Sequence, residues 1–87
     1  MMKREVDPVL EDALKTIGVR IRQIRKERTN LNYKDFAEQL QNDGVMVSKN
    51  TLQRIESGNE NYNLISLLSL LKYFDLQIGD FFKDAGL

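Results

Sequence analysis

The segment from Ser48 to Gly58 constrains the fold of this chain more than any other, because it carries a signal for each end of one short helix. Serine is a preferred residue at helix N-termini, and glycine tolerates the left-handed conformation in which helices commonly end. Between these ends, Leu52 and Ile55 form an apolar inner face. The outer face carries amides, a hydroxyl and two cations, which are side chains that form hydrogen bonds with DNA bases.

A second short helix is predicted just upstream, over residues 33–41. Asn32 is suited to cap its N-terminus, and Phe36 and Leu40 lie on one inner face. The sequence Asn-Asp-Gly at 42–44 ends the helix, because all three residue types tolerate left-handed backbone. Two short helices in tandem, the second with a polar outer face, are typical of a helix-turn-helix.

The rest of the chain predicts three more helices and no strand, because no segment alternates clearly with a period of two. Asp7 before Pro8 is a strong start signal for a helix that runs to about Arg28. Asn63 is suited to cap a helix from Leu64 to Phe74, and a last short helix covers 78–83. We therefore expect an all-α domain of about five helices. The first helix carries one apolar stripe, made of Leu10, Leu14, Ile17, Ile21 and Ile24.

The composition excludes several classes of function. The 87 residues contain neither cysteine nor histidine, which removes disulfides, thiolate metal sites and the commonest general base. We expect no metal, no cofactor and no enzyme activity. No apolar run approaches the roughly 20 residues that span a bilayer, and the first residues lack the apolar part of a signal peptide. The expected location is the cytoplasm, with no membrane partner.

The charge is polarised along the chain although it sums to zero. Residues 1–34 hold nine Lys/Arg and five Asp/Glu, a net +4, whereas residues 35–87 hold four and eight, a net −4. Such a chain is able to present one basic face. A neutral domain nevertheless neutralises few phosphates, so its DNA affinity is expected to depend only modestly on salt. The total charge is mild evidence against a nucleic-acid partner.

The order of these elements resembles the Xre/Cro-type helix-turn-helix family, which has the lambda-repressor-like fold. The resemblance implies a helix-turn-helix domain over 17–87, preceded by an extension over 1–16 that is continuous with the first helix. It also implies that Arg25 pairs with Glu56 and so ties the third helix to the scaffold. The segments that carry the resemblance are Ile17 to Arg25, Leu31 to Ala37, Ser48 to Gly58 and Leu67 to Phe82.

The chain departs from the family pattern at three places near the reading helix. The link from Asn42 to Val47 is longer than usual, Tyr33 stands where glutamine is frequent, and the loop 59–62 lacks the usual basic residue. These departures leave the expected fold unchanged. They bear on the angle at which the third helix enters a DNA groove.

The resemblance implies a set of DNA contacts around the third helix, whose N-terminal end enters the major groove in this family. The residues placed at base-reading positions are Lys49, Asn50, Gln53 and Arg54, with Gln53 contacting either a base or the backbone. Phosphate contacts are expected from the starts of the second and third helices. The residues there are Asn32, Tyr33, Lys34, Ser48 and Thr51.

The function implied is that of a transcriptional regulator, a repressor or an antitoxin-type regulator, which binds double-stranded DNA in a bacterial or phage-like cytoplasm. A homodimer on a two-fold-symmetric site is expected. Its interface is either the stripe of the first helix or an apolar patch of Phe81, Phe82 and Leu87. The alternative is a protein-interaction module that keeps the fold and contacts a protein partner through the 42–47 link and Met46.

Overall fold

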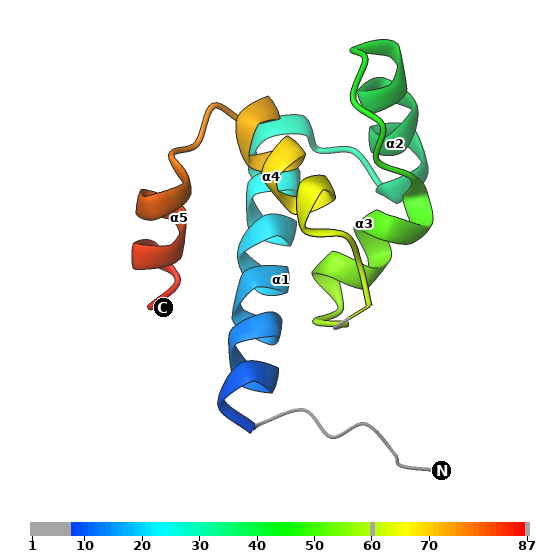
Figure 1. Ribbon diagram of the computed structural model, residues 1–87. Helices are drawn as coiled ribbons and strands as arrows, with labels where there is room; N and C mark the ends of the chain where they lie inside the picture. The colour runs from blue at the N-terminus through cyan, green and yellow to red at the C-terminus, as the bar shows by residue number, and fades with distance from the viewer. Residues whose placement is uncertain (1–7, 60, 87) are drawn as a thin grey trace, which may run out of the picture.

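The computed structural model describes residues 8–59 and 61–86, and within these ranges the chain forms five helices and no strand (Figure 1). The predicted all-α fold is confirmed, and every helix end lies within one residue of its predicted position. Asp7, the predicted cap of the first helix, lies outside the described residues. The helices are α1 (Pro8–Thr29), α2 (Tyr33–Asn42), α3 (Lys49–Glu56), α4 (Leu64–Tyr73) and α5 (Ile78–Asp84).

Side-chain caps fix the starts of α2, α3 and α4. The Asn32 side-chain oxygen accepts a hydrogen bond from the Asp35 backbone N–H at 2.9 Å. Ser48 Oγ accepts from the Thr51 N–H at 3.1 Å, and the Asn63 side-chain oxygen accepts from the Ile65 N–H at 2.8 Å. Each cap satisfies a backbone donor that has no partner within its own helix, which is why these residues determine where the helices begin.

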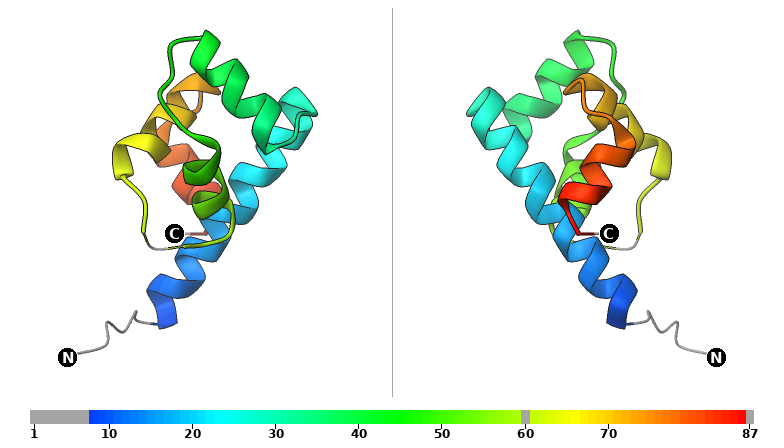
Figure 2. Two further views of the ribbon diagram at one scale, coloured as in Figure 1. Left: turned by 90° about the vertical axis from the view of Figure 1, so that its right-hand side faces the viewer. Right: turned by 90° about the vertical axis from the view of Figure 1, so that its left-hand side faces the viewer.

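In the core, α3 packs directly against α1, α2 packs against α3, and α5 packs against α4. Figures 1 and 2 show α3 and α5 on opposite sides of α1. In the described ranges, no helix combines the length and hydropathy needed to cross a membrane. The buried apolar residues are Ile17, Ile21, Ile24, Phe36, Leu40, Val47, Leu52, Ile55, Leu67, Leu70, Leu71, Phe74 and Phe81.

Two apolar features differ from the sequence-based expectation. The apolar stripe of α1 is buried only from Ile17 onward, because the N-terminal end of this helix extends beyond the core. Leu10, in that end, is 58% exposed. The C-terminal aromatic patch is reduced, because Phe81 is 3% exposed and belongs to the core. Phe82 is partly buried against the core, and Leu87 lies outside the described residues. A helix of seven residues is too short for periodicity to tell which of two adjacent aromatics faces inward.

Gly18 allows α1 to approach the C-terminal end of α3 closely. A Cβ atom at this position would lie 2.6 Å from the carbonyl oxygens of both Ile55 and Glu56. These atoms belong to the backbone and cannot rotate away. Glycine is therefore required here for close packing of two helices, and α1 continues through it unbroken.

The long link between α2 and α3 is held at three points. Tyr73 Oη donates a hydrogen bond to Asp43 Oδ2 at 2.6 Å and accepts one from the Gln39 amide at 2.8 Å. The Val45 N–H donates to the Leu40 carbonyl at 2.8 Å, and the Val47 side chain is buried in the core. The extra length thus forms an ordered connection that leads directly into the N-terminus of α3.

Candidate nucleic-acid interface

The outer face of α3 presents the four side chains that were predicted to read bases. Lys49, Asn50, Gln53 and Arg54 are all exposed, and within residues 8–59 and 61–86 none of these side chains forms a hydrogen bond or an ion pair with the protein. Asn50, Gln53 and Arg54 line an open hollow of about 450 Å³ together with Tyr33 and Ser57. Amides and cations without internal partners are free to bind a ligand that offers donors and acceptors along an edge.

The N-terminus of α3 is held by two hydroxyls that were predicted to contact phosphate. Ser48 Oγ accepts from the Thr51 N–H, and the two hydroxyl oxygens lie 3.0 Å apart in a further hydrogen bond. If Ser48 donates in that bond, the Thr51 hydroxyl keeps its own hydrogen for an outside acceptor. The primary role of the pair is therefore to cap α3, with one donor remaining at its surface.

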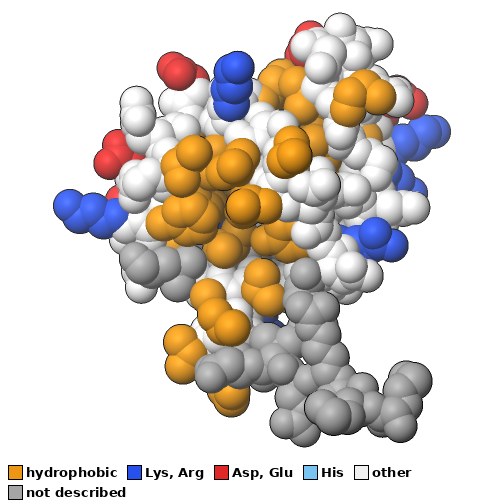
Figure 3. Space-filling model, viewed as in Figure 1, with side chains coloured by type: hydrophobic (Ala, Val, Ile, Leu, Met, Phe, Trp, Pro, Cys, Tyr) orange, Lys and Arg blue, Asp and Glu red, His pale blue; other side chains and the backbone are white. Residues whose placement is uncertain are grey.

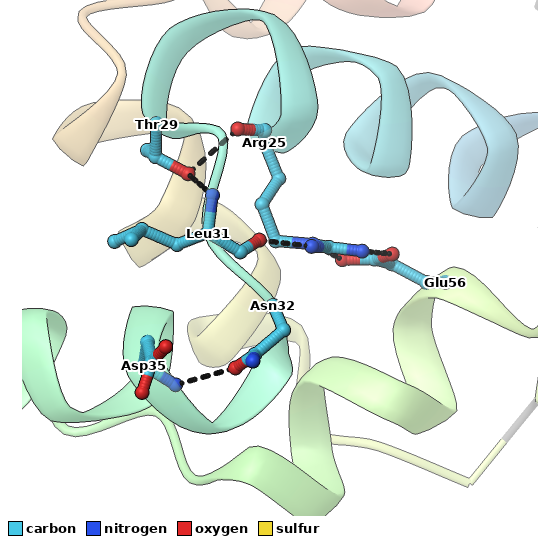
Figure 4. A network of polar contacts seen from close by, with 6 residues as sticks. All are labelled: Arg25, Thr29, Leu31, Asn32, Asp35 and Glu56. Carbon is cyan, nitrogen blue, oxygen red and sulfur yellow. Dashed lines mark hydrogen bonds and ion pairs between the residues drawn. The ribbon is translucent and has the colours of Figure 1, made fainter.

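Arg25 and Glu56 form a bidentate ion pair that joins α1 to the last residue of α3. Arg25 Nε lies 2.8 Å from Glu56 Oε2, and the second guanidinium nitrogen lies 2.9 Å from Oε1. Their side chains are only 4% and 0% exposed. The hydrogen bonds to Glu56 raise the pKa of Arg25 further above its ordinary value, so the guanidinium is always charged. The pair fixes the position of α3 relative to the scaffold (Figure 4).

Arg25 also joins the α1–α2 connection to this network. Its remaining terminal nitrogen donates to the Leu31 carbonyl. Thr29 Oγ1 orients that connection, because it donates to the Arg25 carbonyl at 2.7 Å and accepts from the Leu31 N–H at 3.1 Å (Figure 4). The Tyr33 ring stacks against the guanidinium, 4.5 Å from its central carbon. One side chain therefore contacts α3, α2 and the segment between α1 and α2.

The start of α2 places three predicted phosphate ligands in different settings. The Asn32 side chain is occupied as the helix cap, and the Tyr33 ring is half-buried beneath Arg25. Burial raises the pKa of Tyr33, so its hydroxyl stays protonated and able to donate. Lys34 is exposed and is the one cation among the three.

A second hollow, of about 320 Å³, separates α2 from the start of α3. Lys34 and Glu38 line its α2 side, and Ser48 and Lys49 line its α3 side. Met46 stands at its rim and is 82% exposed. The hollow thus continues the surface formed by the outer face of α3 and adds one apolar side chain to it.

Some residues that organise the site were not predicted as parts of it. Gly18 sets the spacing between α1 and α3, and the only local signal was a glycine inside an amphipathic helix. Tyr33 was expected to bind phosphate, and its stacking on Arg25 could not be foreseen without the fold. Arg28, in the last turn of α1, donates to the Phe74 carbonyl at 2.7 Å and thereby caps α4.

The comparisons with known proteins agree with this arrangement. The family model described as Cro/C1-type HTH DNA-binding domain matches residues 20–85, which include α2, α3, α4, α5 and most of the buried part of α1. Neither the curated proteins nor the solved structures gave a match. The family match agrees with the resemblance that the sequence motifs carry. The chain therefore belongs to the Cro/C1-type helix-turn-helix DNA-binding domains.

Proposed function

We propose that this protein is a sequence-specific transcriptional regulator that inserts the N-terminal half of α3 into the major groove of double-stranded DNA. The observation that carries this proposal is the contrast between the two faces of α3. Its inner face is fixed by Leu52, Ile55 and the Arg25–Glu56 pair, while its outer face holds amides and cations without internal partners. A rigid helix with free hydrogen-bonding groups is suited to read base edges.

The individual contacts follow from side-chain chemistry. Asn50 is proposed to pair with adenine through its amide, and Lys49 and Arg54 to donate to guanine O6 and N7. Gln53 contacts either a base or the adjacent backbone. Phosphates are proposed to be bound by Lys34 and by donors at the helix starts. These donors are the Asn32 amide, the Tyr33 and Thr51 hydroxyls, and the backbone N–H groups that follow Ser48 at the start of α3.

We further propose that two copies bind a two-fold-symmetric site, with half-sites about one turn of DNA apart. Binding over a promoter would block transcription, so a repressor is the simplest mode of action, and an antitoxin-type regulator would act in the same way with a protein partner added. The proposed setting is a bacterial or phage-infected cytoplasm. Because the net charge is zero, we expect DNA affinity to depend modestly on salt.

The alternative function is a protein-interaction module. It is favoured by the neutral charge and by Met46, whose 82% exposure at the rim of a hollow would suit an apolar partner. In that case the free groups on α3 would contact a protein or water, and no DNA sequence would be preferred.

Selection of bound sequences from a random DNA pool at near-physiological salt tests the proposal. Enrichment of a palindrome with half-sites about one turn apart is the expected result. A pure, folded sample that enriches no sequence would contradict sequence-specific binding by the protein alone and would favour the interaction module. Protein with Asn50→Ala and Arg54→Ala serves as the control, because both side chains are exposed and their loss should leave the fold intact.

A further inference from the structure

Met46 is an exposed apolar side chain on a backbone that is fixed around it. It is 82% exposed and belongs to the link that is longer than the family pattern. The Val47 N–H donates to the Val45 carbonyl at 3.0 Å, which closes a three-residue turn with Met46 at its centre. The Val45 N–H is bound to the Leu40 carbonyl, and the Val47 side chain is buried. The Met46 side chain therefore projects into solvent from an anchored position.

This side chain lies beside the start of α3. Met46 lines the hollow of about 320 Å³ between α2 and α3, with Ser48 and Lys49 on the α3 side. Figure 3 shows Lys and Arg side chains along the right-hand edge of the molecule, where Figure 1 places α2 and α3. In the proposed DNA complex, the N-terminal end of α3 enters the major groove and α2 crosses the phosphate backbone. The hollow between the two helices then faces base edges at the rim of the groove.

The charges around this hollow favour a neutral base edge over a phosphate as its occupant. Lys34 and Lys49 are cations, but Glu38 places a carboxylate on the same hollow. That carboxylate would repel a phosphate inside the hollow, whereas the two exposed lysines are free to reach phosphates beside it. A base edge carries no net charge, so Glu38 does not exclude it. The hollow is therefore suited to a base, with the DNA backbone outside.

The apolar character of Met46 indicates which base it contacts. In the major groove, the C5-methyl group of thymine is the one methyl group that the four bases display. A thioether side chain is unbranched and polarisable, so it adapts to a small apolar target. The other apolar residues that line this hollow in the described part of the chain are Ala37 and the buried Val47. One exposed side chain is too little for the apolar centre of a protein interface, but it matches one methyl group.

We propose that Met46 is a further specificity-determining residue, which contacts the C5-methyl group of one thymine in each half-site. The inference deepens the proposed function and rests on it, since it requires α3 in the major groove. Because Met46 and Lys49 line the same hollow, this thymine lies next to the base pair that Lys49 contacts. The extra length of the 42–47 link thus extends the base-reading surface beyond α3.

Replacement of thymine by deoxyuridine in the selected DNA site tests the contact, because it removes the methyl group and keeps the base pair. For wild-type protein, we expect one thymine in each half-site whose replacement raises Kd about fourfold, the effect of withdrawing one buried methyl-sized group from its contact. In Met46→Ala the same replacement should leave Kd unchanged. Met46→Leu keeps a large apolar side chain and should retain most of the effect. Lys49→Ala should relax the preference at the neighbouring base pair.

Thermal unfolding and a matched variant separate a lost contact from a lost fold. Since the Met46 side chain is exposed, Met46→Ala should unfold at the wild-type temperature. Val19 is an exposed apolar residue of α1, in a hollow that α1 forms with Asp84 and Ala85. Val19→Ala should therefore keep the fourfold effect of deoxyuridine. Loss of that effect in Val19→Ala as well would contradict a specific role of Met46.

The outcomes distinguish failure of the inference from failure of the proposed function. A selected site that tolerates deoxyuridine at every thymine would overturn the inference and leave sequence-specific binding standing. The same holds for a site without thymine next to the base pair of Lys49, and for a deoxyuridine effect that persists in Met46→Ala. A folded protein that enriches no sequence would overturn both.

Discussion

Removing one partner of the Arg25–Glu56 pair should lower the stability of the fold far more than removing both partners. Arg25→Met leaves the Glu56 carboxylate, whose side chain is 0% exposed, without its counter-ion, and Glu56→Leu leaves the guanidinium without its own. An uncompensated buried charge destabilises a protein by about 3–5 kcal/mol. A domain of this size has a total stability of about 5–15 kcal/mol, so each single variant should lose a large share of it.

The double variant with Arg25→Met and Glu56→Leu removes both charges and keeps a similar side-chain volume. It still leaves the Leu31 carbonyl without the donor that Arg25 supplies, which costs about 1–3 kcal/mol. We therefore expect a double variant that is more stable than either single one, with a coupling energy of about 4 kcal/mol or more between the two positions.

Urea denaturation at pH 7, followed by circular dichroism with comparison of m-values, measures these differences. The matched control is the Glu11–Lys15 ion pair of α1. Its Lys15 Nζ lies 3.5 Å from Glu11 Oε1, and both side chains are more than half exposed. Lys15→Met should change stability by no more than about 1 kcal/mol. Single variants at 25 and 56 that lose less than about 1 kcal/mol, with additive effects, would refute the reasoning. The folded double variant should also bind DNA more weakly, because α3 loses its tie to α1.

Three further outcomes follow from individual contacts. Asn50→Ala should weaken specific DNA binding by about 1–3 kcal/mol and relax the preference at one base pair, which a competition assay with single-base variants of the selected site would reveal. Gly18→Ala should destabilise the fold by about 1–3 kcal/mol, since its Cβ would lie 2.6 Å from two carbonyl oxygens. Gly79→Ala in α5, where a Cβ meets nothing within 4 Å, should instead be neutral or stabilising. Thermal melts of the two glycine variants measure both changes in stability. The hydrogen bond to Asp43 raises the pKa of Tyr73 above its ordinary 10.0, so its contribution to stability is complete below pH 10 and is lost as the pH rises above that value. Tyr73→Phe should therefore lower stability at pH 7 and give a shallower decline above pH 10 than wild type; identical alkaline profiles would count against this bond.

Local signals made the helices predictable. Asn32, Ser48 and Asn63 each lie next to the backbone donor that they cap, so the sequence alone contains both partners. The same holds for Gly58, whose φ of 77° ends α3 as its position suggested. These contacts join residues two or three positions apart and depend little on the rest of the fold.

Contacts between distant segments were predictable only through the family resemblance or not at all. Arg25 and Glu56 are 31 residues apart, and no spacing rule brings them together. Tyr73 and Asp43 are 30 residues apart, and their bond supports a link that departs from the family pattern. Phe81 was expected at the surface because a short helix does not show which of its sides the rest of the chain covers. The base-reading residues stay a prediction, since exposure on α3 is necessary for that role and not sufficient.

The contacts of the Arg25 side chain also bear on how the molecule opens. Its guanidinium contacts Glu56 of α3, the Leu31 carbonyl and the Tyr33 ring, so α3 cannot separate from α1 without releasing three segments together. Local openings with low free energy require a segment with few such ties. Amide protons in α3 should therefore exchange with deuterium at nearly the same slow rate as those in the buried part of α1. Proteases should likewise cleave α3 only after global unfolding. This short helix should therefore resist proteolysis in a cell as well as the whole domain does.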